Sequence, residues 1–143
     1  MKALFSEAPS LSERDQSLVE AYEQMGRTLD DLPYTQDFDR LVARVQHDFP
    51  EMDERQIFQR LSNLRKAGRL PKLGKGRSRR IPLNAFEEEL IGDLTAQIAG
   101  TLGQRDRLPY TPEFDQIVSR FNERTSQDLS PHDVWRLVAR VAK

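Results

Sequence analysis

Apolar residues recur along the chain at the spacing of α-helices. One segment carries them at i, i+3, i+4 and i+7, at Phe38, Leu41, Val42 and Val45, which places them on one helix face. Six segments of this kind follow one another, and each is preceded by a residue type that caps helix N-termini. The expected N-caps are Ser12, Thr35, Asp53, Asn84, Thr111 and Ser130. The pattern therefore predicts an all-α protein.

The predicted helices fall into two sets of three because the chain repeats itself. The segment LPYTQDFDRLVARV begins at Leu32, LPYTPEFDQIVSRF begins at Leu108, and eight of the fourteen aligned positions are identical. We therefore expect two homologous three-helix lobes, over residues 11–82 and 83–143, whose apolar faces pack within one body.

The repeated LPYT motif has two interpretations. In the structural one, proline fixes the backbone, threonine caps the next helix, and leucine and tyrosine pack back on the first helix of the lobe. In the functional one, Tyr34 and Tyr110 stack on a ligand or contact a phosphate. We favour the structural interpretation, because aromatic residues beside helix caps usually anchor a core.

The same spacing predicts which large side chains are buried. The helix after Asn84 carries Phe86 and Leu90 on its apolar face, and Trp135 matches Phe58 in the repeat. We expect these four apolar side chains in the core.

Charge is distributed unevenly, although the net charge is only −1. Residues 1–54 carry a formal charge of −8 and residues 81–143 carry −3, whereas residues 55–80 contain ten basic residues and no acid. Stable helices profit from mixed charge, so this composition indicates a polyanionic partner. The ordinary alternative is a solvated helix face followed by a linker.

The third predicted helix presents polar side chains opposite its apolar face. If Ile57, Leu61 and Leu64 point inward, the 100° step per residue directs a second set outward. That set comprises Arg55, Gln59, Ser62, Asn63 and Lys66. Arg and Lys contact phosphates or guanine, and Asn and Gln contact adenine. The basic stretch AGRLPKLGKGRSRRIPL follows, and its short apolar pieces predict a small β-hairpin around residues 74–78.

A third helix with polar donors and a basic hairpin after it resembles the winged helix-turn-helix superfamily of DNA-binding proteins. The segment DERQIFQRLSNLRKAGRLPKLG carries this resemblance, which covers about residues 11–82. The resemblance implies that residues 53–67 enter the major groove and that residues 69–80 form a wing along the backbone or minor groove. The chain departs from the simplest members at residues 46–52, where the connection is longer than a tight turn.

We therefore predict a non-enzymatic DNA-binding protein, with transcriptional regulation as its role and DNA favoured over RNA. The second lobe has no wing, but it places Arg136 and Arg140 where the first has Gln59 and Asn63, as expected for a lobe that either contacts phosphates or simply faces solvent. The predicted nucleic-acid-binding residues are Arg55, Gln59, Asn63, Arg65, Lys66, Arg69, Lys72, Lys75, Arg77, Arg79, Arg80, Arg136 and Arg140. The alternative is a helical protein-interaction module whose basic segment docks an acidic partner.

No catalytic residue, cofactor or metal site is predicted. The absence of cysteine excludes a disulfide, a thiolate metal site and a cysteine nucleophile. His47 and His132 have no ligand cluster around them in the sequence, and the GKGRS segment has Gly76 where a phosphate loop requires Ser or Thr. No apolar run approaches the roughly 20 residues of a membrane span, and the first residues do not resemble a signal peptide. We expect a cytoplasmic or nucleoid-associated protein without a membrane partner.

Overall fold

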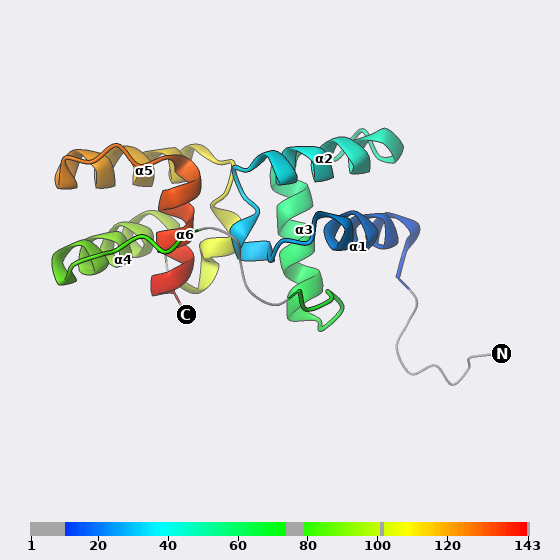
Figure 1. Ribbon diagram of the computed structural model, residues 1–143, viewed down its shortest axis with the longest axis horizontal. Coiled ribbons are helices and arrows are strands. Elements are labelled where there is room, and N and C mark those ends of the chain that lie inside the picture. Colours follow the sequence, from blue (N-terminus) through cyan, green and yellow to red (C-terminus); the bar gives the residue numbers. More distant parts are fainter. Residues whose placement is uncertain (1–10, 74–78, 101, 143) are drawn as a thin grey trace.

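The computed structural model describes residues 11–73, 79–100 and 102–142, and these residues form helices without any strand (Figure 1). The α-helices are α1 (Glu13–Met25), α2 (Gln36–Asp48), α3 (Glu54–Lys66), α4 (Ala85–Ala99), α5 (Pro112–Thr125) and α6 (Pro131–Val141). Two short 3₁₀ helices, η1 (Leu29–Asp31) and η2 (Leu102–Arg107), precede α2 and α5. The prediction of an all-α protein is confirmed.

The helices begin where the capping pattern predicts. Each of the six expected N-cap side chains accepts a hydrogen bond from the backbone N–H three residues further on. At Asp53 and Asn84 the backbone N–H of the N-cap residue donates in turn to the side chain of Gln56 or Glu87, which completes two capping boxes. At the other end of α1, Gly26 takes a φ of 66°, a left-handed conformation in which glycine lacks the Cβ penalty. The residues at which these helices begin and end are therefore determined by their near neighbours in the sequence.

The two triplets of helices have the same internal arrangement. Helix α1 contacts α2 and α3, and α4 contacts α5 and α6. Figure 1 shows α2 and α5 along one edge of the molecule, α1 and α4 below them, and α3 and α6 at the centre. The spatial arrangement follows the repeat in the sequence.

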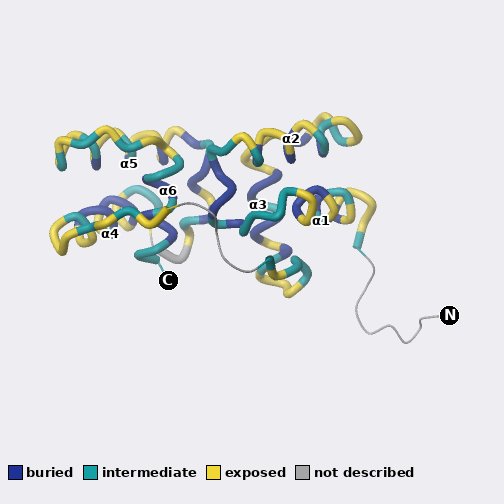
Figure 2. Tube along the Cα trace, in the orientation of Figure 1, coloured by how far each residue is buried: buried dark blue, intermediate teal, exposed yellow. Residues whose placement is uncertain are grey.

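The third helix of each triplet also packs against the other triplet. Helix α3 contacts η2, and α6 contacts η1, where the indole Nε1 of Trp135 donates a hydrogen bond of 3.0 Å to the carbonyl of Asp30. The Trp135 ring lies edge-on to Phe58 and Phe114, with centroid distances of 5.6 and 6.2 Å. Buried residues of both triplets form one hydrophobic cluster, visible as the dark blue centre of Figure 2. Each triplet thus completes its core with residues of the other, and Trp135 fills core as predicted.

The tyrosines of the LPYT motifs bind each other. The backbone N–H of Tyr34 donates to the hydroxyl of Tyr110 at 2.6 Å, the backbone N–H of Tyr110 donates to the hydroxyl of Tyr34 at 2.5 Å, and the rings stack with centroids 4.4 Å apart. Both residues have a φ of 66°, which is uncommon outside glycine. The tyrosines are core anchors, as the structural interpretation predicts, but the aromatic rings on which each one stacks belong to the other triplet.

The predicted β-hairpin wing is wrong for the residues that the structure describes. The segments that should pair, around Leu70 and Ile81, contain no strand, and the predicted turn at residues 74–78 lies outside the described residues. Leu70 and Ile81 instead pack against the helical core. Pro71 and Pro82 beside them lack the N–H that a strand ladder requires.

Two expectations about single side chains are also wrong. Phe86 is 55% exposed, because α4 buries Leu90 and the neighbouring Ile91 and so turns Phe86 outward. Ser62 is fully buried rather than outward-facing. Helix α3 is covered on more than one side, since it packs against both α1 and η2. The exposed residues of α3 are Glu54, Arg55, Gln56, Asn63 and Lys66.

Candidate nucleic-acid interface

The exposed edge of α3 carries the side chains that are predicted to read bases. Arg55 and Asn63 are exposed and Gln59 is half-buried between them along the helix. All three line a hollow of about 410 Å³ beside Arg14, a residue of the first turn of α1. The structure thus brings these three predicted residues together, and it adds Arg14, which the sequence analysis missed.

A second hollow of about 270 Å³ continues the first toward the end of α3. It shares Asn63 and Arg60 with the first hollow and reaches Arg69 beyond the helix. We call the two hollows together the α3 groove. Four arginines line it, together with the acidic residues Glu51, Asp53 and Asp15.

One wall of the α3 groove is a bidentate ion pair. The guanidinium of Arg60 donates to the two carboxylate oxygens of Asp15 at 2.9 and 2.7 Å. These hydrogen bonds hold the pKa of Asp15 below its usual range despite the opposing effect of burial, and they raise the pKa of Arg60. The pair joins α1 to α3, the two helices between which the groove lies.

The depressed pKa of Asp15 predicts a dependence of stability on pH. The contribution of the pair is fully present above the unfolded-state pKa, about 3.9, and is lost as pH falls through the lower folded-state pKa. Because Arg60 is partly exposed, we expect Asp15→Asn to cost only about 1 kcal/mol at pH 7. Urea denaturation of both proteins at pH 7 and pH 3 measures this difference, which should shrink at pH 3. An unchanged difference would contradict the assigned pairing, and Glu20→Gln on the same helix serves as the exposed control.

The predicted phosphate contacts at the end of α3 are bound to carboxylates of the protein itself. Arg65 lies 3.3 Å from Asp30 and Lys66 lies 2.7 Å from Asp106, with both distances measured between nitrogen and oxygen. Asp106 is buried, and Asp30 is also bound by Arg105 at 3.1 Å. These two basic residues therefore tie α3 to η1 and η2.

Arg136 on α6 is likewise bound to a carboxylate of the protein itself. Its Nε lies 3.3 Å from the buried carboxylate of Asp31, which also binds Arg27 at 3.2 Å and lies 3.7 Å from His132. The Nη1 of Arg136 donates to the backbone carbonyl of Arg79. Arg136 thus joins η1, α6 and the segment between α3 and α4.

Sequence reasoning missed the carboxylates that bind these basic side chains. Asp30 and Asp106 occupy the same position in the two repeats, two residues before the repeated LPYT, and this equivalence was a usable signal. Their partners, Arg65 and Lys66, lie far away in the chain and come close only through packing of α3 between the triplets. Charge counting along the sequence cannot separate such paired side chains from exposed ones.

The connecting segment between α3 and α4, residues 67–84, holds the remaining predicted contacts. Lys72, Arg79 and Arg80 are exposed, and Arg69 is half-buried at the end of the α3 groove. The last two predicted contacts in the segment, Lys75 and Arg77, lie outside the described residues.

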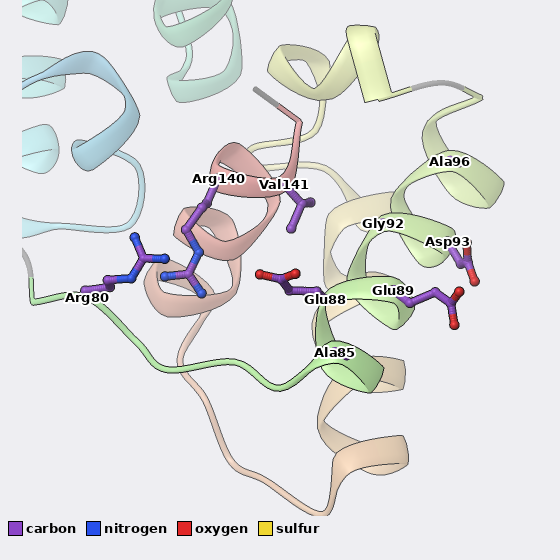
Figure 3. Close-up of a pocket in the computed structure, with 9 residues that line it drawn as sticks. All are labelled: Arg80, Ala85, Glu88, Glu89, Gly92, Asp93, Ala96, Arg140 and Val141. Atoms are coloured by element: carbon purple, nitrogen blue, oxygen red, sulfur yellow. The ribbon is translucent and has the colours of Figure 1, made fainter.

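Arg140 lies apart from the α3 groove. It lines a separate hollow between α4 and α6, together with Arg80 of the connecting segment (Figure 3). Burial lowers the pKa of Arg140, and the nearby positive charge of Arg80 lowers it further.

Metal and membrane sites are not indicated in the described part of the chain. No group of three or more His, Asp or Glu residues there could hold a metal ion, and no helix there has the length and hydrophobicity to cross a bilayer. Comparison with protein-family models, curated proteins and solved structures found no match. The functional argument therefore depends on the chemistry of the surfaces themselves.

Proposed function

We propose that the protein binds nucleic acid, DNA in preference to RNA, through the α3 groove and the connecting segment. The observation that carries this proposal is that Arg55, Gln59 and Asn63 of α3 line one groove, which leads to a segment of exposed basic side chains. The side chains in this groove combine phosphate-binding and base-reading chemistry. A helix-turn-helix-like use of α1 to α3, and a role in transcriptional regulation, are part of the proposal.

In this proposal the predicted residues other than Arg140 divide into three groups. Gln59 and Asn63 contact bases, and phosphate contacts come from Arg55, Arg69, Lys72, Lys75, Arg77, Arg79 and Arg80. Arg65, Lys66 and Arg136 hold carboxylates of the protein and position α3 and α6 instead. Because α3 is covered by α1 and η2, it contacts the duplex through the side that carries its exposed residues.

Changing Lys75, Arg77 and Arg79 together to alanine should weaken binding to duplex DNA about tenfold or more at low salt. Each residue that neutralises a phosphate contributes about 0.9 to the slope of log affinity against log salt concentration, so the slope should become shallower by about 3. Fluorescence anisotropy with a labelled random-sequence duplex, at low and near-physiological salt, measures both quantities.

The matched control changes three exposed arginines elsewhere to alanine, namely Arg40, Arg120 and Arg124. Helices α2 and α5, which carry them, lie along the upper edge of the molecule in Figure 1, away from the end of α3 where the connecting segment begins. The control removes the same charge but should leave most of the affinity in place. Equal losses in the two triple variants would mean that binding follows net charge alone, and this result would refute the assigned surface.

One observation favours a second function, the docking of an acidic protein. Three basic side chains of α3 already bind carboxylates within the chain: Arg60 binds Asp15, Arg65 binds Asp30 and Lys66 binds Asp106. The connecting segment could extend the same chemistry to carboxylates of a partner. Absence of binding to duplex DNA and to an RNA control at low salt would exclude the nucleic-acid proposal and favour this one.

A further inference from the structure

The groove between α4 and α6 has an arrangement of charges of which the proposed function uses only Arg80. It is a hollow of about 660 Å³ with Arg80 and Arg140 on one side and α4 on the other (Figure 3). We call it the α4–α6 groove. The two arginines come from different elements, the connecting segment and α6, and their side chains approach each other in Figure 3.

The repeat shows what is unusual about the α4–α6 groove. It is the counterpart of the α3 groove, because α4 and α6 correspond to α1 and α3. In the α3 groove, Arg60 is bound on both carboxylate oxygens by Asp15. The position of Arg60 is taken in α6 by Leu137, which is buried, and the position of Asn63 is taken by Arg140. The arginine has thus moved by three positions along the helix, to a place where the carboxylate of Glu88 on α4 is directed toward it (Figure 3).

Arg140 has a hydrogen-bond donor without an acceptor. Its Nε is buried and has no hydrogen-bond partner within the part of the chain that the structure describes. Such a donor costs free energy unless an acceptor reaches it. Arg136 adds a further positive charge nearby, and its hydrogen bond to the carbonyl of Arg79 holds the connecting segment, and with it Arg80, beside α6.

We propose that the α4–α6 groove binds a phosphate group between Arg80 and Arg140. A phosphate has enough oxygens, and enough negative charge, to accept hydrogen bonds from two guanidinium groups at once. The proposal goes beyond nucleic-acid binding, because inorganic phosphate or a phosphate monoester could occupy this site without any DNA.

Glu88 determines the direction in which a substitution should change the affinity for phosphate. In Figure 3 its carboxylate is directed across the groove toward Arg140, whereas those of Glu89 and Asp93 are directed away. The charge of Glu88 favours the charged form of Arg140, so it competes with an incoming anion. Removing this carboxylate should therefore tighten phosphate binding, and removing Glu89 should not.

The side-chain Nε–H of Arg140 is a direct reporter of this site. A ¹⁵N-labelled sample of the full chain is titrated with inorganic phosphate, and the arginine Nε–H resonances are compared with a sodium chloride titration at equal ionic strength. We expect a saturable shift of the Arg140 resonance with phosphate only. A non-saturating drift, or the same shift with chloride, would overturn the proposal.

Three substitutions test which residues form the site. Arg80→Gln, at an exposed position that should not affect folding, is expected to weaken phosphate binding about tenfold. Glu88→Gln should tighten binding several-fold, and Glu89→Gln, which makes the same change of net charge, should leave it unchanged. Equal effects of Glu88→Gln and Glu89→Gln would mean that phosphate responds to overall charge and would refute the site.

Two further titrations separate the sources of the phosphate. A short oligodeoxynucleotide that shifts the Arg140 resonance and displaces inorganic phosphate identifies the site as a contact for a nucleic-acid backbone. A response to inorganic phosphate alone supports the site with a small phosphorylated ligand as its occupant. Because the Arg140 resonance is read without DNA, failure of this site and failure of nucleic-acid binding by the α3 groove give different results.

Discussion

Replacing Trp135 by alanine should lower the free energy of unfolding by about 3–5 kcal/mol. The indole is fully buried where α6 crosses toward the first triplet, between Phe58 and Phe114, and it hydrogen-bonds the carbonyl of Asp30. Its removal leaves a cavity between the triplets and an acceptor without its donor. Urea denaturation followed by far-UV circular dichroism measures the loss, since Trp135 is the single tryptophan and its fluorescence disappears with it.

Two variants calibrate this result. Trp135→Phe keeps an aromatic ring but loses the N–H, so it should cost clearly less than the alanine variant. Phe86→Ala removes an aromatic ring at a position that is 55% exposed, and its effect should be within about 0.5 kcal/mol. A loss below about 1 kcal/mol in Trp135→Ala would mean that the shared core does not depend on this crossing.

The helices could be predicted from the sequence because their limits are local. Thr35 and Thr111 accept from the N–H groups of Phe38 and Phe114, within the same four residues of chain. Neither bond requires knowledge of the other triplet. The same locality explains why the capping boxes and the apolar stripes were assigned correctly for most positions.

Packing between the triplets could not be predicted in the same way. The periodicity correctly buries Trp135, but it contains no information that α6 approaches η1. Ser62 was assigned to the outward side because a helix was assumed to have one covered face, whereas α3 contacts both α1 and η2. Phe86 was assigned inward on an i, i+4 stripe with Leu90, and the choice between it and Ile91 depends on how α4 is rotated against its neighbours.

The candidate site was predictable in kind but not in detail. Residue types alone identified Arg55, Gln59 and Asn63, which the structure places along one groove. The same reasoning also included Lys66, whose ammonium group lies 2.7 Å from the buried carboxylate of Asp106. A contact between residues 40 positions apart depends on the tertiary fold, so positive charge in the sequence overestimates the positive surface.

Changing both Tyr34 and Tyr110 to phenylalanine should lower the free energy of unfolding by about 2–4 kcal/mol. Each hydroxyl accepts the backbone N–H of the other tyrosine, so its removal leaves a partly buried donor without a partner. The stacked rings remain, with their area still buried, and the cost comes mainly from the two orphaned N–H groups. Urea denaturation of the two single variants and the double variant measures both the loss and its additivity.

The tyrosine pair also predicts the response to alkaline pH. Burial raises the pKa of both phenols well above their ordinary value, so above about pH 10 the unfolded state releases protons that the folded state retains. Stability should therefore fall as pH rises beyond 10, and more steeply in the wild-type protein than in the double variant, which keeps only Tyr22. Lysines titrate in the same range in both proteins, so the difference between the two slopes reports Tyr34 and Tyr110. Equal slopes in the two proteins would show that the phenols of Tyr34 and Tyr110 ionise as they do in water, and this result would contradict their burial between the two triplets.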